Sequence, residues 1–346
     1  MSASFRSYWA HLRPRSWPVV FGHYGCGAVI ALAHWRGESI AVVLARALTG
    51  GLLWTICLNG GTLALNSAFD KDEGDIGYLD APPPVPRGLA AVAAGLMATG
   101  GALSLALTPG YAAVYGACFI LSLLYSMPPA RLKAVAGADL LVNMAGYGAL
   151  TFAAGALAAG PPPSGSEAPG FRCGIWALAA SFAFLFGAFY PMTQIYQIPE
   201  DMERGDRTLA VRLGARGSLW LSFGMLGCSL ASQMVAGHGA LLGAPRWGMA
   251  CIVLVYAAWA FFTADWLRRI DDYPAKKGMY RALKLWGVTS LVTVAAFSFG
   301  EHGKPHEGHE RAWMVLFRSA STPSGVFHDG NWFIQHLTCR FSAPLI

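Results

Sequence analysis

Apolar runs of roughly 18 to 25 residues recur along most of the chain, and each is long enough to cross a bilayer as a helix. They begin near residues 17, 40, 89, 111, 140, 176, 219, 249 and 283. Within lipid the backbone must satisfy its own hydrogen bonds, which restricts crossing segments to helices or a closed barrel. The pattern therefore predicts an all-α integral membrane protein with about nine transmembrane helices.

The composition supports a membrane protein. Only 13% of the residues are charged and 55% are hydrophobic, whereas a soluble domain carries about a quarter charged residues. The net charge of +6 does not indicate a nucleic-acid partner, because no basic patch with interleaved aromatic residues forms a soluble module. We expect the lipid bilayer to be the main surroundings of the chain; the oligomeric state is not predicted.

The placement of basic residues predicts the orientation in the membrane. Most Lys and Arg residues fall in the N-terminal segment and in every second connection after it. The other connections before residue 300 hold only Arg36, Arg172 and Arg246. By the positive-inside rule the N-terminus is cytoplasmic. We expect a bacterial cytoplasmic (inner) membrane, with the polar loops on the cytoplasmic side.

A dense acidic cluster follows the second apolar run, in NSAFDKDEGDIGYLD (66–80). Its acidic residues are Asp70, Asp72, Glu73, Asp75 and Asp80. On a helix, Asn59, Asn66 and Asp70 share one stripe. Amides facing lipid are costly, which favours a cavity there, and carboxylate oxygens suit Mg²⁺. A solvated acidic loop is the alternative interpretation.

A second acidic cluster follows the sixth apolar run, within YPMTQIYQIPEDMERGDRTLAVRLG (190–214). Tyr190, Gln194 and Gln197 form a polar face before it, and the acidic residues are Glu200, Asp201, Glu203 and Asp206. Both clusters fall on the same predicted side of the membrane. Together they are suited to hold two Mg²⁺ ions around a diphosphate.

Basic residues follow a Pro-Pro pair in YSMPPARLK (125–133). Arg131 and Lys133 are natural partners for diphosphate oxygens, although ordinary anchoring at the membrane surface explains them equally well. Asp139 and Asn143, spaced four apart, begin the next apolar run. An ionisable group there indicates either function or a structural pair with Arg131 or Lys133.

The sequence after residue 300 differs from the rest. His302, His306 and His309 have a spacing that suits a metal on a helix, but Gly and Pro interrupt the run. We therefore expect residues 301–346 to form a polar, poorly ordered tail.

These motifs, in this order, resemble the UbiA superfamily of intramembrane prenyltransferases. The matching pieces are LRPRSWP (12–18), the Asn-xxx-Asp of NSAFD, PPPVPRG, YSMPPARLK and the Gln/acid/TLAVRLG pattern at 197–214. The resemblance covers about residues 8 to 300. It implies a domain over residues 1–300 with helices bundled around a central cavity. It also implies Mg²⁺-dependent transfer from a prenyl diphosphate to an electron-rich acceptor of the aromatic, quinone-precursor or natural-product kind.

The motifs and the resemblance together predict the site residues. The predicted catalytic residues are Asn66, Asp70, Arg131, Lys133 and Asp201. The predicted substrate-binding residues are Asn66, Tyr125, Ser126, Arg131, Lys133, Asn143, Tyr190, Gln194, Gln197 and Arg207. The predicted metal ligands are Asp70, Asp72, Glu73, Asp75, Glu200, Asp201 and Asp206.

Two other functions are compatible with these motifs. A terpene cyclase of the same superfamily uses the acidic motifs without an acceptor. A transporter also uses charged groups within the membrane, although its site belongs near the midplane.

Overall fold

The computed structural model describes residues 3–34, 39–70, 82–160, 168–203 and 205–299, all within the compact unit Met1–Gly303. These residues form helices and connections, with one isolated bridge between Val135 and Arg207 and no longer strand among them. The predicted tail over 301–346, which includes His302, His306 and His309, lies outside the described residues.

The helices occur in the following order, where η marks a 3-10 or π segment. They are α1 (Ala3–His11), η1 (Pro14–Ser16), α2 (Trp17–Ala33), α3 (Ile40–Leu52), η2 (Leu53–Gly60), α4 (Gly61–Asp70), α5 (Leu89–Ser104), α6 (Pro109–Ser126), η3 (Leu132–Ala134), α7 (Ala138–Asn143), η4 (Met144–Leu150), α8 (Thr151–Ala158), α9 (Ala168–Gln194), η5 (Ile195–Gln197), α10 (Ile198–Glu203), α11 (Leu209–Ala236), α12 (Arg246–Arg268) and α13 (Ala275–Ser298).

Seven of these helical segments are long and apolar enough to cross a membrane. They include two composite rods, Ile40–Asp70 and Ala138–Ala158, in which a π segment continues the helix. The helix α5 is apolar but shorter, and α13 carries basic residues in its first half. Over the described ranges there are thus nine long rods, and the prediction of an all-helical membrane protein is confirmed.

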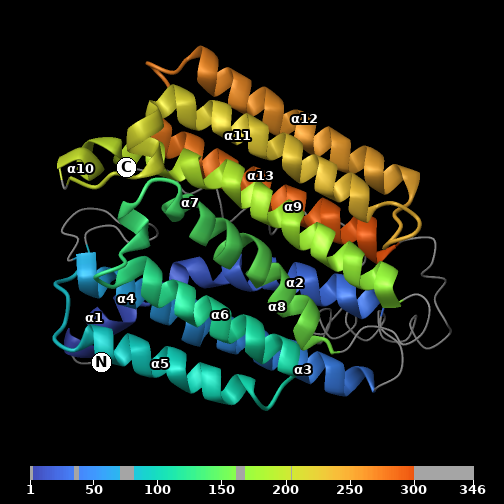
Figure 1. Ribbon diagram of the computed structural model, residues 1–346, viewed down its shortest axis with the longest axis horizontal. Helices are drawn as coiled ribbons and strands as arrows, with labels where there is room; N and C mark the ends of the chain where they lie inside the picture. Colours follow the sequence, from blue (N-terminus) through green and yellow to red (C-terminus); the bar gives the residue numbers. More distant parts are fainter. Residues whose placement is uncertain (1–2, 35–38, 71–81, 161–167, 204, 300–346) are drawn as a thin grey trace, which may run out of the picture. The chain divides into compact units, whose positions relative to one another are not determined.

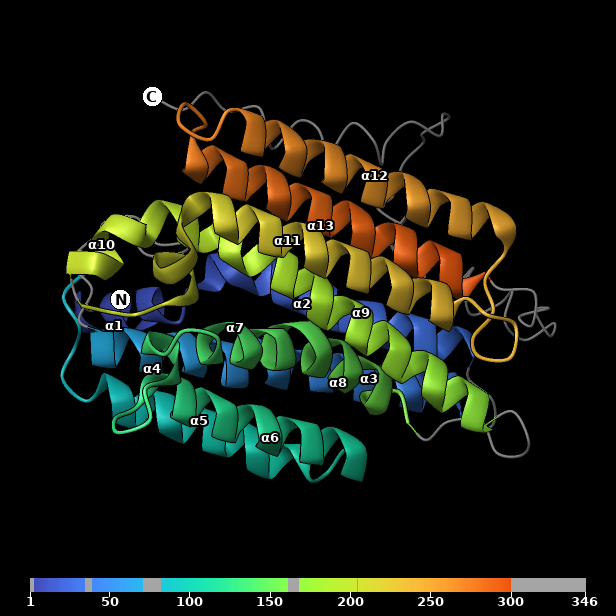
Figure 2. The ribbon, with the colours of Figure 1, turned by 45° about the horizontal axis from the view of Figure 1, so that its top comes forward.

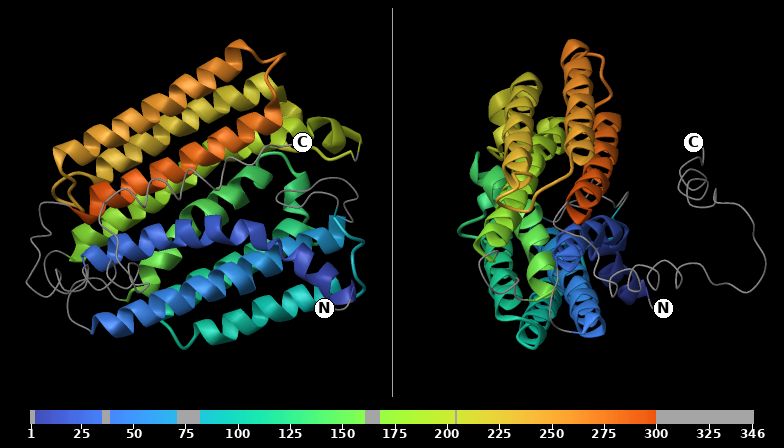
Figure 3. Two further views of the ribbon diagram at one scale, coloured as in Figure 1. Left: turned by 180° about the vertical axis from the view of Figure 1, so that it is seen from behind. Right: turned by 90° about the vertical axis from the view of Figure 1, so that its right-hand side faces the viewer.

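The rods pack side by side in one bundle (Figures 1 and 2). The helices α3 to α6 form one side of it and α11 to α13 the other, with α2, α8 and α9 between them. The view from behind shows α2 running between these two groups (Figure 3). The most extensive packing joins α9 to α11 and α2 to α8.

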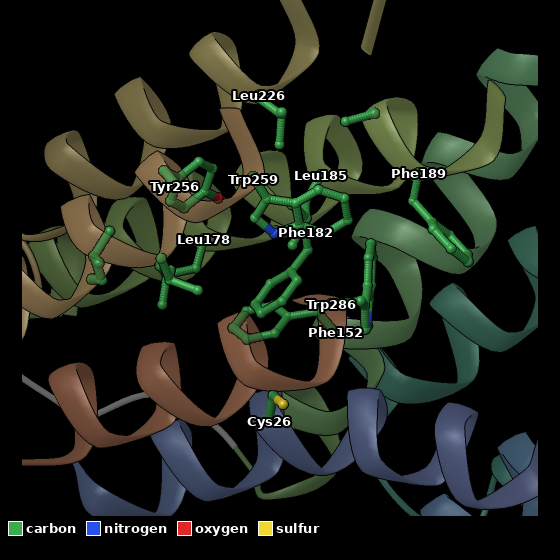
Figure 4. Close-up of a cluster of buried hydrophobic side chains, with 14 of the residues drawn as sticks. Cys26, Phe152, Leu178, Phe182, Leu185, Phe189, Leu226, Tyr256, Trp259 and Trp286 are labelled. Atoms are coloured by element: carbon green, nitrogen blue, oxygen red, sulfur yellow. The ribbon is translucent and has the colours of Figure 1, made fainter. Parts of the chain in front are cut away.

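Glycines let α2 and α8 approach closely. A Cβ atom on Gly27 of α2 would collide with the backbone carbonyl of Phe152, and one on Gly155 of α8 with that of Tyr24. Small residues serve this purpose in membrane bundles, because helices there gain from close van der Waals contact. Large aromatic side chains fill the neighbouring core, where Phe152, Phe182 and Trp286 gather (Figure 4).

The polar connections meet at one end of the bundle. The end of α4, the start of α7 and the short helix α10 all lie at the left in Figure 1. The first acidic cluster begins at the end of α4, the basic segment precedes α7, and the second acidic cluster includes α10. The fold therefore gathers the two acidic segments and the basic segment in one region.

Candidate active site

A cavity of about 510 Å³ lies between the rods and reaches this charged end of the bundle. Its volume falls in the range of small-molecule sites, about 300–1,000 Å³. Its walls come from α2, the rod that ends in α4, α6, the rod of α7 and α8, α9 and α13. The predicted site residues that line it are Asn66, Asp70, Tyr125, Lys133, Asn143, Tyr190, Gln194, Gln197, Glu200, Asp201 and Asp206.

The wall formed by η2 and α4 shows how the cavity changes character along its length. Trp54, Leu58, Thr62, Asn66 and Asp70 all line it, at intervals of four residues. This spacing keeps side chains on one face of a helix. The wall is apolar at its inner end and becomes polar and then acidic at the charged end. A molecule with an apolar tail and a charged head matches this gradient.

Lys133 holds the first acidic motif together. Its Nζ donates a 3.0 Å hydrogen bond to Oδ1 of Asn66 and forms an ion pair with Asp70. The side chains of Lys133 and Asp70 are only 10% and 12% exposed. This low exposure strengthens the attraction, because charges shielded from water interact more strongly.

Arg131 connects the first acidic motif to the second. Its Nη1 lies 3.0 Å from Oδ1 of Asp206, and its Nη2 lies 3.9 Å from Oδ1 of Asp70. The backbone of Arg131 has a φ of 36°, in the left-handed region. The basic segment therefore lies between the two acidic segments and offsets their mutual repulsion.

Asp201 anchors the second acidic segment. It is only 3% exposed, and its Oδ2 accepts a 3.3 Å hydrogen bond from the hydroxyl of Thr208. The Thr208 oxygen in turn accepts from the amide of Val211, so it caps the start of α11. The amide of Asp206 donates to the backbone oxygen of Asp201 at 2.9 Å. These bonds fix both carboxylates relative to α11.

Asp139 joins the basic segment to the second acidic segment through backbone amides. The residue is fully buried. Its Oδ1 accepts from the amide of Gly137 at 2.8 Å, and its Oδ2 accepts from the amide of Leu209 at 3.0 Å. Leu209 is the first residue of α11. Of the two interpretations drawn from the sequence, the structural one fits these contacts, although the partners are amides rather than Arg131 or Lys133.

The predicted amide and tyrosine side chains form shorter contacts along the wall. The hydroxyls of Tyr125 and Tyr190 lie 3.3 Å apart. Asn143 donates to the backbone oxygen of Asp139 at 2.8 Å. Gln194 and Gln197 donate to the hydroxyls of their neighbours Thr193 and Tyr196, at 3.2 and 2.9 Å.

The remaining predicted residues occupy different positions. Ser126 is fully buried behind Asn66 and donates to its Oδ1 at 3.4 Å. Glu200 lines the cavity but is exposed at its rim. Arg207 is exposed and does not line the cavity. Asp72, Glu73 and Asp75 lie outside the described residues, so their role as metal ligands remains a prediction.

Within the described part of the chain, no three His, Cys, Asp or Glu side chains lie close enough to hold a metal ion. Asp70 and Asp206 are instead paired with Lys133 and Arg131. Of the predicted metal ligands, Asp70, Glu200, Asp201 and Asp206 lie within the described residues, and Asp72, Glu73 and Asp75 lie outside them.

Other side chains line the cavity besides the catalytic, substrate-binding and metal residues predicted from the sequence. Tyr147 donates to Oδ1 of Asn59 at 3.0 Å, and the Asn59 amide donates to Ser16 at 3.4 Å. Trp54 and Trp286 lie deeper in the cavity. Trp54 lies twelve residues before Asn66, which is three intervals of four. This spacing in the sequence could have placed Trp54 on the same wall as Asn66.

The fold and the cavity define a class of protein: a helical integral membrane protein with an internal cavity that is charged at one end and apolar inside. The chain belongs to the UbiA prenyltransferase family, whose model matches residues 17–288. The protein is thus an intramembrane prenyltransferase, and the predicted family is confirmed.

Solved structures have the same fold. A UbiA homologue from Archaeoglobus fulgidus bound to GPP and Mg²⁺ is 19% identical, with a TM-score of 0.61 over 85% of this chain and 98% of that one. A digeranylgeranylglyceryl phosphate synthase is 14% identical, with a TM-score of 0.62 over 86% of this chain and 99% of the other. An apo UbiA homologue from Aeropyrum pernix K1 is 19% identical, with a TM-score of 0.53 over 80% and 96%. No curated protein matches the sequence.

Proposed function

We propose that this prenyltransferase binds a prenyl diphosphate with Mg²⁺ and transfers the prenyl group to an electron-rich acceptor, of the aromatic, quinone-precursor or natural-product kind. One observation carries the proposal. Lys133 pairs with Asp70 at the charged end of a cavity whose inner walls are apolar. Arg131, which does not itself line the cavity, connects Asp70 with Asp206 there. A diphosphate with an isoprenoid tail has this distribution of charge. The Archaeoglobus homologue bound to GPP and Mg²⁺ supports the same assignment.

The donor set fits Mg²⁺, which binds a few carboxylates together with substrate phosphates. Asp70, Asp201 and Asp206 supply hard oxygen ligands at the charged end, and Asp72, Glu73 and Asp75 are the predicted additional donors. Lys133 and Arg131 are natural diphosphate partners. Once they contact the diphosphate, the carboxylates they now neutralise become available to a cation. The metal, when bound, neutralises charge on the leaving diphosphate.

The residues around the cavity support ionisation of the substrate. Lys133 and Arg131 stabilise the negative charge that grows on the diphosphate as its bond to C1 of the prenyl group breaks. The prenyl group becomes an allylic cation, and we expect Tyr147 and Tyr190, which line the cavity, to stabilise it through their ring faces. The apolar walls exclude water. The acceptor carbon forms the new bond to C1, and its proton leaves to diphosphate or to a nearby carboxylate.

The test is a purified-protein assay with Mg²⁺, a panel of prenyl diphosphates, and 4-hydroxybenzoate, homogentisate or dihydroxynaphthoate, followed by mass spectrometry. We expect a prenylated acceptor together with inorganic diphosphate. A cyclic hydrocarbon formed without any acceptor would establish the cyclase instead. Release of neither product, with the protein still folded, would contradict both activities.

We also propose that the charged end of the bundle faces the cytoplasm of a bacterial cell, as the distribution of Lys and Arg predicts. Fusions of a fluorescent protein and of alkaline phosphatase to residue 238, in the connection between α11 and α12, test this orientation. We expect phosphatase activity there and no fluorescence, because this connection would lie on the outer side.

A further inference from the structure

On each long helix that lines the cavity, the lining residues stop part way along the helix. Each rod contributes residues from the charged end inward and then stops, so the innermost residues together form a floor. These residues are His23, Trp54, Cys118, Thr151, Phe186 and Trp286. Beyond them the same helices contribute no residue to this cavity.

The layer beneath the floor is closely packed. Gly27 and Gly155, one helical turn below His23 and Thr151, bring the backbones of α2 and α8 into contact. Phe152 and Tyr24 in this layer are 0% and 1% exposed. No space for a ligand continues past the floor along these two helices.

Trp54 is held rigidly in the floor. Its indole Nε1 donates to the hydroxyl of Thr151 at 3.2 Å. Its ring packs against Tyr111 and Tyr115, with centroids 6.2 and 6.0 Å apart. The two tyrosine hydroxyls donate to backbone oxygens of Gly50 and Met97, at 2.7 and 3.1 Å. Buried hydrogen bonds of this kind oppose movement of the rings, because breaking one leaves an unsatisfied polar group.

The other half of the floor is aromatic too. The ring of His23 lies 5.1 Å from that of Trp286 and 4.6 Å from that of Phe182, and its Nε2 lies 2.9 Å from the backbone oxygen of Gly148. Figure 4 shows Trp286 beside Phe152 and Phe182 in the packed core. Large aromatic rings therefore line the inner end of the cavity on both sides.

The depth of the cavity follows from helix geometry. Twelve residues separate Trp54 from Asn66, a rise of at most about 18 Å at ~1.5 Å per residue. Eleven residues separate Phe186 from Gln197 on the opposite wall, which gives about 16 Å by the same rule. An extended isoprene unit adds about 5 Å, from four chain bonds of ~1.5 Å in zigzag. The space between the diphosphate end and the floor thus accommodates three to four isoprene units.

We propose that this aromatic floor limits the prenyl diphosphate to chains of about four isoprene units, and that Trp54 is the residue that sets the limit. The inference rests on the proposed function and adds the substrate class, short prenyl diphosphates up to geranylgeranyl. A longer chain meets the indole of Trp54 before its diphosphate reaches Lys133.

The test measures binding, so it does not depend on the unknown acceptor. The full chain in lipid nanodiscs is titrated, in Mg²⁺, with non-hydrolysable thiolodiphosphate analogues of geranyl, geranylgeranyl and solanesyl diphosphate, which have two, four and nine units. We expect the geranylgeranyl analogue to bind at least tenfold more tightly than the solanesyl analogue.

Two variants shift the limit in opposite directions. Trp54→Ala is expected to reduce the preference for geranylgeranyl over solanesyl at least fivefold, since it opens the floor. Leu58→Trp, one turn nearer the charged end, is expected to weaken the geranylgeranyl analogue at least fivefold relative to geranyl. Trp220→Ala is the matched control, because Trp220 is 62% exposed on α11, away from the cavity. It should leave both ratios unchanged.

The outcomes separate the inference from the function. Equal affinity of wild type for geranylgeranyl and solanesyl analogues overturns the floor and indicates that the tail leaves sideways into lipid, while the proposed function stands. Unchanged ratios in both Trp54→Ala and Leu58→Trp overturn the role of the floor as well. If no prenyl analogue binds more tightly than inorganic diphosphate, the proposed function itself is contradicted.

Discussion

At the scale of single residues, two basic side chains, Lys133 and Arg131, form the ion pairs with the acidic residues of the site. Lys133 is 10% exposed and contacts both Asn66 and Asp70, the two residues of the Asn-xxx-Asp motif. Arg131 is 39% exposed and connects Asp70 with Asp206. The more buried cation should therefore contribute more to the chemistry, because a shielded charge acts more strongly on a developing one.

Replacement of Lys133 tests this ranking. We expect Lys133→Ala to lower kcat/KM for prenyl transfer by a factor of about 100 or more, comparable to losing one donor to a developing anion. Lys133→Arg should restore part of the loss, since the charge returns with a different geometry. Steady-state kinetics by mass spectrometry provide the measurement. A value of kcat/KM for Lys133→Ala within threefold of wild type would contradict the role.

Arg207 provides the comparison. The sequence predicts a substrate contact for it, whereas the structure places it exposed and off the cavity wall. Arg207→Ala is therefore expected to keep kcat/KM within about threefold, as is typical of surface substitutions. A loss as large as that of Lys133→Ala would support the substrate contact.

At the scale of elements, the site is assembled by contacts between helix ends. Asp139 at the start of α7 accepts from the first amide of α11, and Arg131 pairs with Asp206 before α11 begins. The bridge between Val135 and Arg207 lies between these contacts. The segments 131–139 and 206–209 are thus joined by several contacts.

Removal of the Asp139 carboxylate should weaken the connection between these segments. We expect Asp139→Ala to destabilise the protein by about 1–3 kcal/mol, because two partly buried amides lose their acceptor. Asp139→Asn keeps one acceptor oxygen and should cost less. The measurement is the Tm in detergent, with Asp271→Ala, an exposed position after α12, as control. An unchanged Tm in Asp139→Ala would show that these bonds contribute little.

The close contact of α2 with α8 leads to a second prediction, which concerns the stability of the protein. Gly27→Ala is expected to destabilise the protein by about 3 kcal/mol or more, because the added methyl collides with the carbonyl of Phe152. Gly25→Ala on the same helix meets nothing within 4 Å and should leave the Tm unchanged or slightly raised. Equal Tm values for the two variants would contradict the close approach.

At the scale of the whole molecule, local patterns predicted the fold and long-range contacts decided the rest. Apolar length identified the crossing helices, even though several begin earlier than the apolar run, as α13 does at Ala275. The stripe of Asn66 and Asp70 placed them on one wall because helical spacing is a local property. The amide partners of Asp139 and the floor around Trp54 depend on residues some 70 to 100 positions away. No spacing rule encodes such contacts.

The central claim is that the charged end of the cavity ionises a prenyl diphosphate with Mg²⁺. Its most direct test is the release of inorganic diphosphate from geranylgeranyl diphosphate, with acceptor present, by wild type and by Asp70→Ala and Asp201→Ala. We predict release by wild type in Mg²⁺, none in EDTA, and at least a hundredfold lower rate in each folded variant. Equal rates in wild type and both variants, or release that persists in EDTA, would contradict the account.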